Sequence, residues 1–109
     1  MVQLVLLNII ADKFMFFICI IYIMNKYLVE FLGTLFFIYV ILASGSPLAI
    51  AAAFLLTIMV IGPISGGHIN PAVTITMVQA GKLPQGEMLP YIASQIAGGL
   101  AALQIFQRV

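Results

Sequence analysis

Long runs of hydrophobic residues, broken in a few places by polar or turn-forming residues, make up most of the chain. A helix needs roughly 20 apolar residues to cross the hydrocarbon core of a bilayer. Three runs approach this length and lie between turn signals rich in Gly, Pro and Ser. The middle run is short for a full span and ends at Gly62-Pro63, which suits a helix that stops early and continues as a loop. The pattern therefore predicts three transmembrane helices, at 27–43, 48–61 and 87–106.

The residues between the second and third runs predict a re-entrant loop and a half-helix over 62–80. Two glycines free the backbone to turn. Asn70 is a strong helix N-cap, and Pro71 suits the first helical position because its missing N–H is not needed there. Gly81 is a natural stop at the other end. Ten helical residues span roughly 15 Å, about half of the hydrocarbon core, so the half-helix is expected to begin at mid-depth.

A further apolar stretch, residues 1–24, is interrupted by Asp12 and Lys13. The run after this break is too short to cross a bilayer by itself, and the stretch lacks the basic start and small-residue cleavage site of a signal peptide. Two interpretations stay open. The stretch is either an extra helix that carries a costly ion pair, or an extension outside a working protein that starts at Met24. The sequence favours the start at Met24.

Composition places the chain in a membrane and excludes several other classes. Of its 109 residues 64% are hydrophobic and 6% charged, with a mean hydropathy of +1.26, which predicts an all-α, multi-pass integral membrane protein in a lipid bilayer. A net charge of +1 gives no basic stripe for nucleic acid. One Cys and one His cannot form a metal cluster, and no nucleophile–base set is present, so we expect neither cofactor nor enzymatic activity.

The ten residues SGGHINPAVT at 65–74 resemble the first Asn-Pro-Ala box of the aquaporin and glycerol-channel family. The resemblance covers residues 25 to about 106. It implies that residues 25–109 form half of the aquaporin fold, with three transmembrane helices and one re-entrant half-helix. Complete family members carry two such units in inverted orientation, whereas this chain carries one box.

The resemblance also implies a set of pore-lining residues in and before the half-helix. Asn70 would keep amide N–H donors for a passing oxygen, and the helix N-terminus would add a positive end that orients water and repels cations. The alternative is that Asn70 only caps the helix. The His68 side chain is expected to brace the loop rather than to gate protons. The implied pore-lining set is Gly66, Gly67, His68, Asn70, Pro71 and Ala72.

Three residues outside the loop are singled out by the same resemblance. Glu30 matches a first-helix Glu that accepts hydrogen bonds from loop N–H groups; the alternative is an interfacial Glu paired with Lys26. Gln95 is expected to brace the loop from the third helix. Ile50 matches the second-helix position of the narrow selectivity filter, unless it is an ordinary core- or lipid-facing residue.

The expected function is a passive channel for water, with small neutral solutes such as glycerol as further permeants. A single half-unit would expose loop backbone to lipid, where each unsatisfied group costs several kcal/mol. We therefore expect two or more half-units, as an antiparallel dimer or higher oligomer, or pairing with a complementary half-channel. The alternative is a non-conducting fragment or modulatory subunit that docks on a full-length channel.

Overall fold

The computed structural model describes residues 1–23 and 26–109. Met24, where one interpretation starts the working protein, lies outside the described residues. Every element within them is helical, which confirms the all-α class. The elements are α1 (Val2–Ile23), α2 (Lys26–Ser44), α3 (Pro47–Ser65), α4 (Pro71–Gln79), the 3₁₀ turn η1 (Gln85–Glu87) and α5 (Met88–Arg108).

Four helices in the described ranges, rather than three, are long and apolar enough to cross a membrane. The additional one is α1, whose candidate span covers Val2–Ile20. Asp12 and Lys13 do not break this helix, because charged side chains remain compatible with helical backbone and both are exposed here. The chain is thus a multi-pass integral membrane protein.

The predicted end of the second helix at residue 61 is wrong. Helix α3 continues through Gly62 and Pro63 to Ser65. A proline inside a membrane helix removes one backbone hydrogen bond but is tolerated when the surroundings satisfy the freed groups. The helix ends instead at Gly66, whose φ of 90° is left-handed and whose N–H donates to the Gly62 carbonyl. The other two spans differ from their predicted bounds by only one or two residues at each end.

Helix α4 has both of its predicted end signals. Asn70 caps its start, with Oδ1 accepting from the Ala72 N–H at 2.8 Å. At its end, Gly81 has a φ of 75°. The N–H of Gly81 then reaches the Val78 carbonyl and that of Lys82 the Met77 carbonyl, the pattern of a Schellman motif. The helix is therefore nine residues long, one fewer than predicted, and ends at Gln79.

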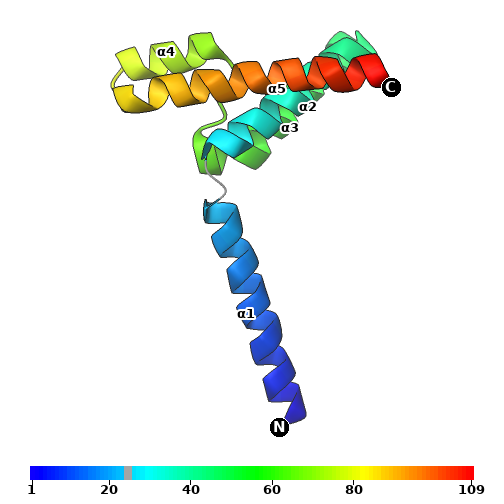
Figure 1. Ribbon diagram of the computed structural model, residues 1–109, viewed down its shortest axis with the longest axis vertical. Coiled ribbons are helices and arrows are strands. Elements are labelled where there is room, and N and C mark those ends of the chain that lie inside the picture. Colours follow the sequence, from blue (N-terminus) through cyan, green and yellow to red (C-terminus); the bar gives the residue numbers. More distant parts are fainter. Residues whose placement is uncertain (24–25) are drawn as a thin grey trace.

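Helices α2, α3, α4 and α5 form a small bundle with α2 at its centre (Figure 1). Helix α2 packs against α3 on one side and α5 on another, while α4 lies beside the N-terminal half of α5. Glycines allow these close approaches. A Cβ on Gly98 would lie 2.4 Å from the Phe31 carbonyl oxygen, and one on Gly33 would lie 2.7 Å from Ile61 Cδ1. Helix α1 lies apart from the bundle in Figure 1, and its side chains are exposed as far as Ile20, except for a half-buried Ile18.

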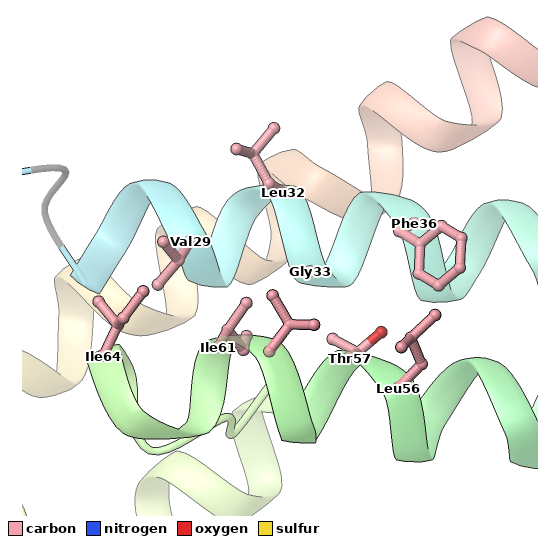
Figure 2. A pocket seen from close by; sticks show the side chains of 9 residues that line it. Val29, Leu32, Gly33, Phe36, Leu56, Thr57, Ile61 and Ile64 are labelled. Carbon is pink, nitrogen blue, oxygen red and sulfur yellow. The ribbon is translucent and has the colours of Figure 1, made fainter. Parts of the chain in front are cut away.

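An apolar groove of about 370 Å³ runs between α2 and α3 (Figure 2). Its single side-chain oxygen, Thr57 Oγ1, is already bonded to the Ala53 carbonyl at 2.7 Å. The groove therefore offers no free donor to a polar solute. It is lined by Val29, Leu32, Gly33, Phe36, Leu56, Thr57, Val60, Ile61 and Ile64.

Replacing Gly98 should loosen the contact between α2 and α5. The Gly98→Ala variant places a methyl group against the Phe31 backbone, so it should lose about 1–3 kcal/mol of stability. The matched control is Gly99→Ala on the same helix, where the new Cβ would meet only Ile38 Cγ1 at an ordinary 3.9 Å. Thermal unfolding in detergent, followed by circular dichroism, measures both. Equal melting temperatures for the two variants would contradict the close approach.

Candidate functional site

The loop between α3 and α4 has an unusual backbone. Gly66 and Gly67 have φ angles of 90° and 64°, and Ile69 has a φ of 44°. The left-handed region is natural for glycine but strained for a β-branched residue, at a cost on the order of 1–3 kcal/mol. Ile69 is nevertheless buried, with 5% of its surface exposed. Contacts around the loop must therefore hold this conformation in place.

The carboxylate of Glu30, on α2, supplies those contacts. Its Oε1 accepts from the His68 N–H at 2.8 Å and from Ser65 Oγ at 2.7 Å. Its Oε2 accepts from the Ile69 N–H at 2.7 Å and from Gln95 Nε2 at 3.1 Å. Glu30 is completely buried. Four donors from α3, the loop and α5 thus converge on one side chain.

Gln95 continues this network from α5 to the half-helix. Its Nε2 also donates to Thr74 Oγ1 at 2.9 Å, and Thr74 Oγ1 lies 3.0 Å from His68 Nδ1. All three side chains are buried. The His68 side chain is therefore held inside the protein by Thr74, on the same side of the loop as Glu30.

Tyr91 fixes the end of α3 from the other side. Its hydroxyl donates to the Ser65 carbonyl at 2.8 Å, and its ring lies 5.1 Å from the His68 ring. Sequence reasoning did not single out Ser65, Thr74 or Tyr91. Ser65 and Thr74 are the first and last residues of the ten-residue box, which was the available signal. Tyr91 lies one helical turn before Gln95 on the same face of α5.

Asn70 faces away from this buried network and is exposed. Its Oδ1 is used as the helix cap, whereas among the described residues no acceptor is bonded to its Nδ2. Gly66 and Ala72 are also exposed, Pro71 is half-buried, and Gly67 is buried. The loop thus has one side bonded to the protein and one open side that carries the Asn70 amide.

The remaining candidate, Ile50, lies elsewhere. Ile50 is half-buried in the first turn of α3, whereas the loop follows the last turn of that helix.

Lys26 forms an ion pair with Glu87 at the start of α5, not with Glu30. The alternative of an interfacial Glu30 paired with Lys26 is therefore wrong.

Comparison with known proteins identifies the chain. The family model for the major intrinsic protein matches residues 19–109. The chain belongs to the major intrinsic protein family. The match begins a few residues before the resemblance seen in the sequence and includes the last part of α1.

Relatives of this major intrinsic protein are much longer than the chain. Aquaporin Z of Brucella melitensis biotype 1 is 38% identical over 97 residues, covering 75% of this chain and 42% of the relative. Glycerol uptake facilitator protein-like 6 of Lactiplantibacillus plantarum is 43% identical over 88 residues, covering 72% of this chain and 41% of the relative. Aquaporin Z of Bradyrhizobium diazoefficiens is 33% identical over 97 residues, covering 75% of this chain and 40% of the relative. The chain thus spans about two fifths of each relative's length. No solved structure is a significant match.

Substituting Glu30 tests how far this major intrinsic protein depends on one carboxylate. In Glu30→Gln, an NH₂ replaces one oxygen, and both oxygen positions face donors, so neither amide orientation satisfies the loop. Each charge-assisted hydrogen bond lost is worth about 1.5–3 kcal/mol, so the variant should unfold at lower temperature in detergent and its loop should be cleaved faster by protease. The control is Glu87→Gln, which removes a part-exposed ion pair worth at most about 1 kcal/mol. Similar losses in both variants would contradict a special role for Glu30.

Proposed function

We propose that this major intrinsic protein forms half of a passive transmembrane channel for water and small neutral solutes, with a second half-unit closing the pore. The observation that carries the proposal is the exposed Asn70 amide, which follows a loop whose buried N–H groups, those of His68 and Ile69, donate to Glu30. The buried network supports the expected roles of Glu30 and Gln95 as braces of the loop.

The chemistry at the start of α4 suits a file of water molecules. The Asn70 Nδ2 hydrogens can donate to the oxygen of a passing solute. The N-terminus of α4 adds a partial positive charge at the same place, which orients water and disfavours cations. Because Asn70 Oδ1 is engaged by the Ala72 N–H, the amide is fixed with its donors outward. The same geometry supports a pore-lining role for the exposed Gly66 and Ala72.

A second unit is needed because the open side of the loop and α4 has no cover. A groove of about 310 Å³ runs along this side of α4, lined by Ala72, Val73, Thr76 and Met77. In lipid, non-helical backbone is tolerated only where protein covers it or where it lines a wet cavity. The relatives are more than twice as long as this chain, which leaves room in each for a second unit. An inverted second copy would supply the cover here.

Val73 influences the expected selectivity. In the family's second box an Arg stands three places after the Asn, whereas here that position, counted from Asn70, is Val73. A symmetric pore would therefore be lined by loop carbonyls and two copies of Ile50, without a fixed cation. Such an opening is wider and more apolar than a strict water filter, and its cation barrier rests on the helix ends alone. Glycerol-sized neutral solutes should pass along with water.

Flux through the purified protein tests the proposal. Proteoliposomes should swell in both water and glycerol gradients in stopped-flow experiments, with a small proton leak reported by a pH-sensitive dye. Asn70→Asp places a negative charge at the start of α4 and should raise the leak several-fold. Gln85→Glu adds the same charge in an exposed turn and should leave the leak unchanged. Absence of any flux would instead favour the modulatory subunit, and water flux without glycerol flux or leak would exclude the symmetric pore.

The inverted arrangement predicts that the C-terminus lies on both sides of the membrane. Gln107→Cys in a Cys19→Ser background places one thiol at an exposed site near the end of α5. In cells without a full-length relative, an impermeant maleimide should label about half of the molecules, and permeabilised cells should give full labelling. Labelling of all molecules or of none in intact cells would show a single orientation and contradict the antiparallel dimer.

A further inference from the structure

The single histidine of the chain, His68, has one ring nitrogen inside the hydrogen-bond network and one outside it. Nδ1 lies 3.0 Å from Thr74 Oγ1, whereas Nε2 has no partner among the described residues. Nε2 is also not one of the fully buried atoms that lack a partner there, which are Thr34 Oγ1 and Gln95 Oε1. His68 keeps 8% of its surface exposed, and a Cβ on the exposed Gly66 would lie 3.2 Å from Nε2. Nε2 therefore reaches the surface of the loop beside Gly66.

The directions of the hydrogen bonds, starting at Glu30, determine which ring nitrogen carries the hydrogen. The Glu30 carboxylate acts as an acceptor toward all four of its partners, so the Gln95 amide must turn its NH₂ group toward Glu30 Oε2. The opposite orientation would set Gln95 Oε1 against the carboxylate, acceptor against acceptor. The second hydrogen of the same NH₂ group then donates to Thr74 Oγ1 at 2.9 Å.

Thr74 passes this direction on to His68. Its hydroxyl has one hydrogen, and its oxygen already accepts from Gln95. The other side chain bonded to this buried hydroxyl, within the described part of the chain, is His68 through Nδ1. The Thr74 hydrogen therefore points to Nδ1, which is the bare nitrogen that accepts it. The ring hydrogen is then carried by Nε2.

We propose that Gln95 and Thr74 are positioning residues that fix His68 as its Nε2–H tautomer, so that the loop presents a side-chain N–H donor beside Gly66. Such a donor binds a neutral oxygen acceptor, either water or the hydroxyl of a small polyol. This solute contact rests on the proposed function, in which Gly66 lines the pore, whereas the tautomer itself does not. The role also differs from that of a brace, because a ring that only fills space could carry its hydrogen on either nitrogen.

Nitrogen NMR of the only histidine tests the tautomer. The full chain, labelled with ¹³C,¹⁵N-histidine and purified by a tag without histidine, is reconstituted in lipid vesicles and measured by solid-state NMR at mildly alkaline pH. The nitrogen that correlates with Cδ2, which is Nε2, should carry the hydrogen. The nitrogen that correlates with Cγ, which is Nδ1, should have the shift of a bare nitrogen. The opposite assignment, comparable amounts of both tautomers, or a ring protonated at both nitrogens would overturn the proposal.

Two threonines on α4 supply matched variants. Thr74→Val removes the hydroxyl but keeps the side-chain shape, so the Nδ1 signal should move toward that of an unbonded nitrogen and the Nδ1–H tautomer should rise several-fold. Thr74→Ser should restore the original spectrum, and Thr76→Val, at an exposed position, should leave it unchanged. Gln95→Met frees the Thr74 oxygen to accept from Nδ1–H and should also raise that tautomer several-fold. Spectra of Thr74→Val and Gln95→Met identical to the original, or no rescue by serine, would overturn the proposal.

Two measurements on the same vesicles separate the tautomer from the channel. Magnetisation from water protons should reach the His68 Nε2–H signal, because this donor lies at the surface of the loop. Water and glycerol flux is followed in parallel. Conduction without the Nε2–H tautomer, or without transfer from water, counts against the His68 donor alone. The Nε2–H tautomer with transfer from water but without conduction counts against the channel alone.

Discussion

The structure of the bundle depends on the hydrogen bonds that the buried Glu30 carboxylate accepts from the loop. A loop that enters a membrane leaves backbone N–H groups without helical partners, and lipid offers none. Glu30 satisfies the N–H groups of His68 and Ile69 and the hydroxyl of Ser65 with its two oxygens. A carboxylate suits this task because it accepts at both oxygens in several directions. Without it, the N–H groups of His68 and Ile69 would lose their hydrogen-bond acceptor.

The other features of the site follow from this anchor. Ile69 is held in a left-handed conformation that it would not adopt alone, because its N–H is bonded and its side chain is buried. Gln95 extends the network to Thr74, and Thr74 to His68, so the first turn of the half-helix is tied to α5. The start of α4, and with it Asn70, is thereby fixed relative to three helices. The proposed pore-lining role of Asn70 depends on this fixed position.

The two sides of the loop differ in how their polar groups are used. The buried side donates to Glu30, while the open side presents Asn70 and borders a groove along α4. The proposed second half-unit would cover this groove.

The sequence by itself determined the features that depend on neighbouring residues. Run length and hydropathy gave the membrane class and the approximate positions of the three bundle spans. Cap chemistry gave the start of α4 and its end to within one residue, because these signals act within a few residues. The ten-residue box was enough to identify the family. The tertiary structure decided what depends on distant residues: the donors to Glu30 come from positions 35 to 65 residues further along the chain. The same holds for the anchoring of Ser65 by Tyr91 and for the extension of α3 past Pro63, because a helix end is set by the contacts that satisfy its last turn.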